Sequence, residues 1–296
     1  MRTGQTNAAL RTLSDKSQGH SLPLDQLCST GETVREVLKS KHPTSSPPTV
    51  DALIPDSSPE PEFHPISFVN ITGQRIRQIV LRCMGLAGQS GLDASAWQRL
   101  CTSFGRCSAD LCSSIAALAR RLCTDHVDPA GLSSSVACRL IALDKNPGVR
   151  PMGVGEVLRR IVGKAIMTVV KDDVQRAAGA NQLCAGQEAG CEAAVHAVRR
   201  LFTDTDAECA ILVDASNAFN FLNRQVTLRN VQKLCPPIAT ALLNCYRGDA
   251  ELYIGGETIL STEGTTQGDP LAMAFYVLAT VPLSKALTKQ EISGDG

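Results

Sequence analysis

The feature that most constrains the fold is a β-hairpin pattern near the end of the chain. Leu252-Tyr-Ile254 and Thr258-Ile-Leu260 are short, β-prone runs on either side of Gly255-Gly256-Glu257. Two such runs around a glycine pair are typical of antiparallel strands joined by a tight turn. Helical patterns precede and follow this hairpin, so the chain mixes strands with helices. This order predicts an α+β fold in which an antiparallel sheet is backed by helices.

Apolar periodicity and cap residues place the other elements. Leu111, Ile115, Leu118 and Leu122 repeat at helical spacing, and Asp269 before Pro270 is a typical helix start. We expect Pro236-Pro237 to stop the helix before it, and Asn146-Pro-Gly148 to form a turn. The expected strands are 136–143 and 209–213. The expected helices are 33–41, one from about 94, 109–123, 156–178, 188–202, 224–234 and one from 269 to 287.

Residues 1–62 differ in composition from the rest of the chain. They are rich in Ser, Thr and Pro, as in the run Lys41-His-Pro-Thr-Ser-Ser-Pro-Pro-Thr49. Such a segment cannot sustain a regular helix or a strand ladder. We therefore expect a flexible, disordered leader over 1–62, with the globular part beginning near Phe63.

Charge is balanced over the whole chain but not along it. The formal net charge is zero, with 29 basic and 29 acidic residues, which argues against a uniformly basic nucleic-acid-binding surface. Residues 139–171 nevertheless carry seven basic residues against two acidic ones, and residues 249–269 carry five acidic residues and no basic one. The two segments suit a polyphosphate and a metal ion, respectively. Two solvated faces without a partner explain the same pattern.

The cysteines and the N-terminal residues bear on the compartment. None of the twelve cysteines forms a Cys-x-x-Cys pair, and the N-terminal residues lack the apolar core of a signal peptide. We expect reduced, mostly buried thiols in an intracellular protein, in the cytoplasm or the nucleus. A zinc site from Cys107, Cys112, Cys123 and His126 is the alternative, although its spacing matches no common zinc finger. No apolar run is long enough to span a membrane.

Two segments carry residue types suited to chemistry. In Ile211-Leu-Val-Asp214-Ala-Ser-Asn-Ala-Phe219, a carboxylate follows a short apolar strand, where it would be a rigid metal ligand. In Glu263-Gly-Thr-Thr-Gln-Gly-Asp-Pro-Leu271, a glycine-rich turn leads directly into a helix, and its backbone amides and Gln suit a nucleotide or phosphate. Each motif alone is also explained as an ordinary cap or turn.

Taken in order, four motifs resemble those of a reverse transcriptase domain of the retroelement type, especially non-LTR-like elements. The resemblance spans about residues 85–287. Its motifs are Gly88-Gln-Ser-Gly-Leu-Asp93 with Trp97, Arg139 to Lys145 followed by Arg150-Pro-Met-Gly153, Leu212-Val-Asp214 through Leu222, and Thr265-Thr-Gln-Gly-Asp-Pro270.

The resemblance implies a right-hand polymerase architecture, with a fingers-like, mostly helical region over 63–205 and a partial palm over 206–296. It also implies template-directed addition of deoxynucleotides to a primer 3′ end on an RNA or DNA template, with Mg²⁺ or Mn²⁺ as cofactor. The roles it implies are the catalytic metal ligand for Asp214, triphosphate contacts for Lys145 and Arg150, a steric gate for Phe219, and nucleotide-pocket contacts for Gln267 and Gly268.

The sequence lacks one motif of that family. Reverse transcriptases carry a Tyr-x-Asp-Asp after the second palm motif, and this sequence contains none. Asp172-Asp173 lies in an expected helix, where neighbouring residues do not share a face. We therefore expect a fragment without the rest of the palm and the thumb, inactive as a polymerase by itself, with an unpaired strand edge at 211–213. The alternative is a non-catalytic nucleic-acid-binding module or a retroelement relic.

Overall fold

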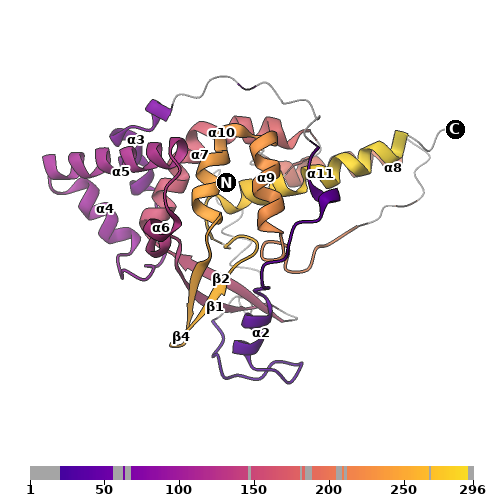
Figure 1. Ribbon diagram of the computed structural model, residues 1–296, viewed down its shortest axis with the longest axis horizontal. Helices are drawn as coiled ribbons and strands as arrows, with labels where there is room; N and C mark the ends of the chain where they lie inside the picture. The colour runs from indigo at the N-terminus through magenta and orange to yellow at the C-terminus, as the bar shows by residue number, and fades with distance from the viewer. Residues whose placement is uncertain are drawn as a thin grey trace, which may run out of the picture.

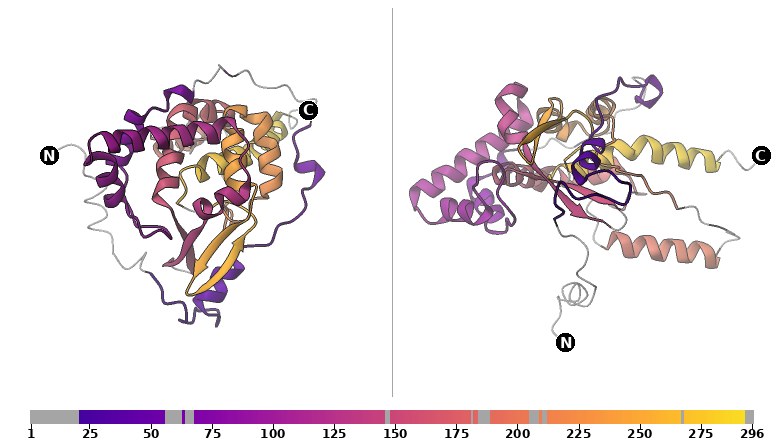
Figure 2. Two further views of the ribbon diagram at one scale, coloured as in Figure 1. Left: turned by 60° about the vertical axis from the view of Figure 1, so that its left-hand side comes forward. Right: turned by 90° about the horizontal axis from the view of Figure 1, so that it is seen from below.

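The computed structural model describes residues 21–55, 63, 68–145, 148–180, 182–183, 189–204, 209, 212–266 and 268–292. Over these ranges the chain is α+β, as expected, with most helices above a four-stranded sheet in Figure 1 and α2 below it (Figures 1 and 2). The helices are α2 (Val34–Ser40), α3 (Gly73–Leu81), α4 (Ala94–Thr102), α5 (Arg106–Thr124), α6 (Pro129–Val136), α7 (Val157–Ala178), α8 (Gly190–Asp204), α9 (Arg224–Leu234), α10 (Pro236–Tyr246) and α11 (Ala272–Ile292), with the 3-10 turns η1 (Val50–Ala52) and η2 (Phe68–Asn70).

The sheet is mixed, which corrects the expectation of an antiparallel sheet. Its strands are β1 (Cys138–Asp144), β2 (Val149–Gly155), β3 (Ala250–Ile254) and β4 (Glu257–Ser261), in the order β2-β1-β3-β4. The two hairpins are antiparallel, but β1 pairs with β3 in parallel, with Cys138 opposite Leu252. The local hairpin signals say nothing about how two hairpins join, since that pairing depends on the helices between them.

The predicted β3–β4 hairpin is confirmed. Ile254 pairs with Glu257 across Gly255 and Gly256, whose φ angles are +51° and +86°. A two-residue turn of this kind needs positive φ at both positions, and glycine adopts it without a steric penalty. The pattern of the sequence therefore encodes both the turn and the register of this hairpin.

One helical core joins most of the chain. Side chains from α3, α5, α7, α9, α10 and α11 form a continuous buried cluster. Ile161 and Ile166 of α7, Leu242 of α10 and Phe275 of α11 are fully buried in it. The predicted helices 109–123, 156–178 and 224–234 correspond to α5, α7 and α9. Pro236-Pro237 follows the end of α9 as expected, but it also begins α10, because proline fits the first turn of a helix.

The sheet is covered by part of the predicted leader, which departs from the expectation of a flexible segment over residues 21–55. Val34 and Leu38 lie one helical turn apart on α2 and are buried against apolar side chains of β1, β2 and β3. Thr33 and Glu36 form a capping box at the start of this helix. The backbone NH of Leu22 also donates to the carbonyl of Ala142 in β1 (2.9 Å). Sheet burial outweighs the unfavourable local composition here.

The strand expected at 209–213 is absent from the residues described there. Leu212 and Val213 are extended but unpaired, with exposed fractions of 94% and 90%. An isolated strand has no partner for its backbone groups, so the apolar pattern alone cannot hold it in a sheet. The helix predicted at 188–202 is confirmed as α8, which stands apart from the body in Figure 2.

The helices in the described ranges are too short or too polar for a membrane span. The cysteines in the described ranges are all free thiols, and six of them are buried. The zinc alternative is not supported there, because no three His, Cys, Asp or Glu side chains of the described residues are grouped to hold a metal ion.

Candidate functional site

Three segments that are distant in sequence meet beside strand β2. They are residues 152–155 at the end of β2, the turn 217–222, and the loop 263–270 between β4 and α11, here called the 263–270 loop. Its Thr265 NH donates to the carbonyl of Phe219 (2.7 Å), and its Gly264 NH donates to the carbonyl of Leu222 (2.8 Å). These bonds join the two segments that the sequence singled out for chemistry.

Absent side chains allow this close approach. A Cβ at Gly264 would overlap the backbone of Phe219 and Asn220, and a Cβ at Gly153 would overlap the Cγ2 methyl of Thr266. A Cβ at Gly268 would lie 3.1 Å from the Gly153 carbonyl oxygen. Glycine is therefore a packing requirement at the first two positions, since a closely packed contact cannot absorb an extra methyl group.

A buried arginine holds the base of the loop. Arg224, the first residue of α9, is 5% exposed. Its side chain donates to the carbonyls of Gly264 (3.1 Å), Glu263 (2.9 Å), Ser261 (2.9 Å) and Gly248 (3.1 Å), and to the hydroxyl of Ser261 (3.1 Å). Burial lowers the pKa of Arg224 from its usual value. This fixed fork of donors satisfies several carbonyls of the turn at once.

A second charged group closes the other end of the loop. Asp269 accepts from Arg159 Nε (2.8 Å), from the Tyr246 hydroxyl (2.8 Å) and from the NH of Leu271 (3.0 Å). The side chains of Arg159 and Asp269 are only 10% and 3% exposed. Burial, together with the charge of Asp269, raises the pKa of Tyr246 well above its usual value. Asp269 thus caps the turn that precedes α11 and is also a buried counter-ion, while the helix itself begins at Ala272 and not at Pro270 as expected.

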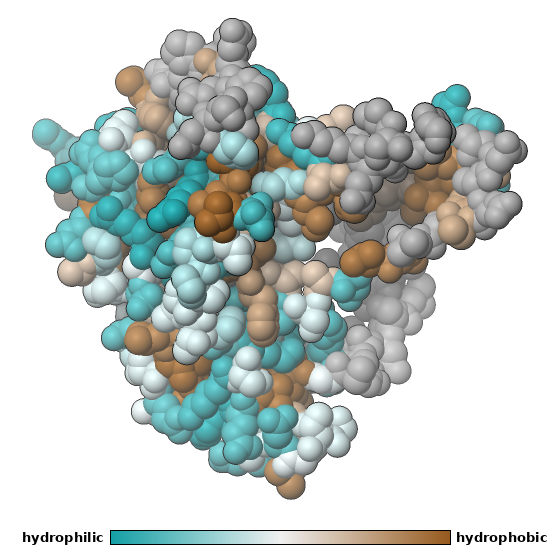
Figure 3. Space-filling model, turned by 45° about the vertical axis from the view of Figure 1, so that its right-hand side comes forward, coloured by the Kyte–Doolittle hydropathy of each residue, from teal (hydrophilic) through white to brown (hydrophobic). Residues whose placement is uncertain are grey.

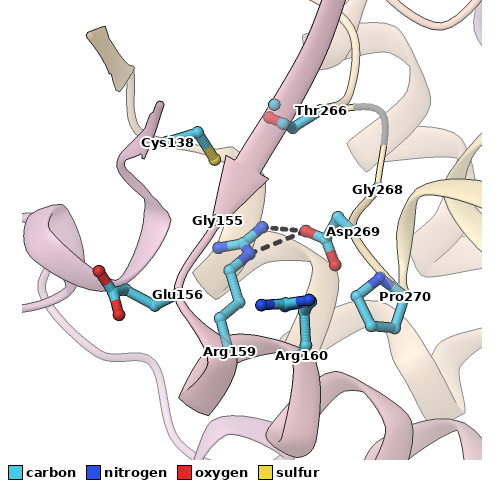
Figure 4. Close-up of a pocket in the computed structure, with 10 residues that line it drawn as sticks. Cys138, Gly155, Glu156, Arg159, Arg160, Thr266, Gly268, Asp269 and Pro270 are labelled. Carbon is cyan, nitrogen blue, oxygen red and sulfur yellow. Dashed lines mark hydrogen bonds and ion pairs between the residues drawn. The ribbon is translucent and has the colours of Figure 1, made fainter. Parts of the chain in front are cut away.

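Figure 4 shows the hollow between these groups, with Arg159 pointing at Asp269 and Glu156 pointing away. The cavity itself measures about 10 Å³, which is about the room that one water molecule needs. Pockets for small molecules usually measure about 300–1,000 Å³, so a nucleotide does not fit inside this hollow and would have to lie on the open surface. The lining residues are Cys138, Gly153, Gly155, Glu156, Arg159, Arg160, Thr266, Gly268, Asp269 and Pro270.

A further loop borders the hollow. Arg160 donates to the carbonyls of Met84 (2.9 Å) and Leu86, and Glu156 accepts from the NH and the hydroxyl of Ser90, both at 2.7 Å. The glycine-punctuated loop before α4 is therefore tied to the first turn of α7. The sequence marks this loop by its glycines, but not its contact with α7.

Lys145 and Arg150 lie at the tip of the β1–β2 hairpin, and both are exposed. Among the described residues, neither side chain forms an ion pair. Arg150 shares a face of β2 with Met152, whose Sδ would lie 3.6 Å from a Cβ at Gly268. Of these two side chains, that of Met152 therefore lies beside the 263–270 loop.

Phe219 and Asp214 have different environments. The ring of Phe219 is half-buried and packs against Tyr276 of α11, with ring centroids 4.8 Å apart. Asp214 is exposed in a non-helical, unpaired segment. Gln267 lies outside the described residues. Sequence reasoning also missed Arg159, Tyr246 and Arg224 as site residues, since an isolated Arg or Tyr on a helix gives no pattern to find.

The described residues near Asp214 do not fit a two-metal centre. Divalent cations such as Mg²⁺ take several oxygen ligands, usually from more than one carboxylate. Within the described ranges, no three His, Cys, Asp or Glu side chains form a group that could hold a metal ion. The resemblance implies Asp214 as a metal ligand, but the described residues supply no further carboxylates near it to complete the coordination of a metal ion.

Comparison with known proteins adds no family assignment. Neither the protein-family models nor the curated protein sequences match this chain.

Proposed function

We propose that this chain is the fingers region and the first part of the palm of an RNA-directed DNA polymerase, and that its role is to hold the template–primer and the incoming deoxynucleotide. The observation that carries this proposal is that the 263–270 loop contacts both other segments, the Phe219 turn at Gly264 and strand β2 where Thr266 meets Gly153. The resemblance assigns these three segments to one nucleotide site, and they lie far apart in sequence.

The charges at the hairpin tip support the same proposal. Lys145 and Arg150 are exposed cations at the tip of the β1–β2 hairpin, whose strand β2 contacts the 263–270 loop further along, at Gly153. Phosphates are bound by such cations through charge-assisted hydrogen bonds, with Arg able to contact two oxygens. We infer that these two side chains contact the triphosphate or the template backbone.

The chemistry of the complete reaction needs more than the described residues offer. Because their donor set does not fit a two-metal site, no catalytic step is assigned to Asp214 here. The proposed function of this chain is therefore binding and positioning.

The experiment is a binding titration with a fluorescein-labelled RNA template annealed to a DNA primer, at several salt concentrations. The variant Lys145→Ala/Arg150→Ala should bind more weakly and lower the slope of log affinity against log salt by up to about two, roughly one for each lost phosphate contact. The matched control is Arg77→Ala/Arg82→Ala, which removes the same charge from exposed positions in and just after α3, outside the basic 139–171 segment. Equal losses in both variants would mean that only net charge matters, and would contradict the proposal.

A non-catalytic nucleic-acid-binding module is the second candidate, favoured by the isolation of Asp214. Primer extension with Mg²⁺ or Mn²⁺ separates the two candidates. We expect no extension by this chain alone and unchanged template–primer binding in Asp214→Ala. Extension that disappears in Asp214→Ala would instead assign catalysis to this chain.

A further inference from the structure

Residues 41–54, here called the strap, run across the turn that carries Phe219. Asparagine side chains of that turn bond to the strap backbone. Asn217 and Asn220 donate to the carbonyl of Lys41 (2.7 and 3.1 Å), and Asn223 donates to the carbonyl of Ser46 (2.9 Å). These bonds replace the strand ladder that the segment lacks.

The rest of the strap is attached in the same way. Asn230 of α9 accepts from the NH of Ile54 and donates to the carbonyl of Ala52, both at 2.9 Å. The NH of Ser46 donates to Glu263 Oε1 (2.9 Å), and the hydroxyl of Thr262 donates to the carbonyl of Pro43 (3.1 Å). Polar bonds dominate this contact. In contrast to α2, the strap therefore depends on individual hydrogen bonds more than on apolar burial.

His42, a strap residue, bonds to the turn through its imidazole ring, and the geometry of its two hydrogen bonds fixes the protonation state of that ring. Its Nδ1 lies 2.8 Å from the carbonyl oxygen of Leu38, so Nδ1 carries a hydrogen. Its Nε2 lies 3.1 Å from Asn220 Nδ2. The bond from the same Nδ2 to the Lys41 carbonyl identifies this atom as the amide nitrogen, a donor. Nε2 must therefore accept, which requires a neutral imidazole.

We propose that His42 is a pH-sensitive latch that holds the strap closed over the Asn217–Leu222 turn when it is neutral and releases it when it is protonated. A proton on Nε2 would face the two hydrogens of the Asn220 amide. Rotating that amide would satisfy His42 but would break the bond to Lys41. Either way, one buried hydrogen bond is lost.

The surroundings of His42 favour the neutral form. Burial is the main cause that lowers its pKa; the hydrogen bond to the Leu38 carbonyl raises it by less, and the charge of the adjacent Lys41 lowers it by less still. Lys145 at the β1–β2 turn in turn repels Lys41, and the nearest strap-bound acid, Glu263, is held by Ser46 and by the NH of Arg224. The ring also lines a hollow with Asn220, Ser261 and Thr265, whose buried hydroxyl has no hydrogen-bond partner among the described residues. A water molecule there would give protons a path to the ring.

The direction of the pH dependence follows from linkage. The closed strap lowers the pKa of His42, while in an open strap the pKa would be near the ordinary value of about 6.5. Closure is then strongest above about pH 6.5 and weakens as the pH falls, by up to about tenfold per pH unit, until His42 is protonated in the closed state too. This inference does not rest on the proposed function, because it concerns a conformational equilibrium of the chain itself.

The test is hydrogen–deuterium exchange of the whole chain between pH 7.5 and 5, corrected for the intrinsic exchange rate. In the wild type, protection of peptides from 41–54 and 217–223 should fall below about pH 6.5, while protection of α7 stays constant. In His42→Gln it should stay constant in all three, because the Gln amide can donate to Leu38 and accept from Asn220 at any pH. His126→Gln, which changes an exposed histidine, should behave as the wild type.

A second variant guards against a folding effect in the first. In Asn220→Asp the carboxylate accepts from a protonated Nε2, so the fall in protection should be smaller than in the wild type or reversed. If the protection of residues 41–54 from exchange does not change with pH in the wild type, the proposal that His42 acts as a latch is wrong. An equal fall in His42→Gln, or a parallel fall in α7 that indicates global acid unfolding, would also overturn it.

Discussion

The 263–270 loop and the 212–216 segment carry the two motifs that the sequence marked most clearly, and the structure treats them very differently. The loop is held by Arg224 at its base, by Arg159 and Tyr246 at its end, and by Phe219 between them. In the other segment, Leu212, Val213 and Asp214 are exposed and lie outside helix and sheet. Helix α8 likewise exposes the apolar side chains of Val195, Val198 and Phe202, and Figure 3 shows brown, apolar side chains on the part of the molecule that projects to the right.

The difference shows what each motif needs in order to form. A loop is held in place when side chains on neighbouring helices donate hydrogen bonds to its backbone carbonyls, and a single side chain is enough for each such bond. A buried strand needs a whole neighbouring strand. The first requirement is met within the described residues, and the second is not. The following predictions test this contrast, in order of decreasing effect.

Arg224→Ala should give the largest effect. It removes five side-chain donors from a buried set of carbonyls and a hydroxyl, and each buried acceptor left without a donor costs about 1–3 kcal/mol. Chemical denaturation should show this as a lower free energy of unfolding. Arg229→Ala, on the exposed face of the same helix, is the control and should change it by less than about 0.5 kcal/mol.

Asp269→Asn should have a smaller effect of about 2–3 kcal/mol, below that of a fully broken buried ion pair. The Asn side chain keeps an acceptor for Tyr246 but leaves the buried charge of Arg159 without its counter-ion. A double-mutant cycle with Arg159→Met measures the coupling. If the two single losses simply add, the pair makes no specific contribution, and the end of the loop is held by packing alone.

Gly153→Ala should cost about 1–3 kcal/mol, because the new methyl group overlaps the Cγ2 atom of Thr266. Thr266→Ser removes that atom and should by itself have a small effect. The double variant should recover most of the lost stability in thermal unfolding. Without such recovery, the close approach of β2 to the 263–270 loop would not be the cause of the loss.

Leu212→Asp should have the smallest effect, within about 0.5 kcal/mol, since the side chain is 94% exposed. The measurement is again chemical denaturation of the full chain, with Leu252→Asp in the buried β3 strand as the opposite case. A loss above about 2 kcal/mol at Leu212 would mean that this segment is packed in solution, and the contrast between the two motifs would disappear.

Local signals in the sequence predicted the elements that local physics controls. The spacing of apolar residues identified α5, α7 and α9, and Gly255-Gly256 identified the β3–β4 hairpin. Strand β2 was missed, because Arg150-Pro-Met-Gly153 contains a proline and a glycine that argue against a strand. Pairing with β1 along seven residues outweighs that preference.

The candidate site was predictable only in part. The motifs indicated Lys145, Arg150, Phe219 and Gly268 by their order in the chain, and the proposed roles of these residues stay predictions. The buried partners Arg159, Tyr246 and Arg224 gave no signal, because each forms its contacts across more than twenty residues of sequence. Only the folded chain defines such pairs.

The sequence by itself determined helices α5, α7, α8 and α9 and the β3–β4 hairpin turn, since periodicity and backbone conformation are local properties. The tertiary structure alone decided that β1 and β3 pair in parallel, that residues 21–55 cover the sheet and the Phe219 turn, and that 212–213 stays unpaired. Each of these outcomes depends on which distant surface is available for burial or hydrogen bonding. A segment's own residues do not encode that availability.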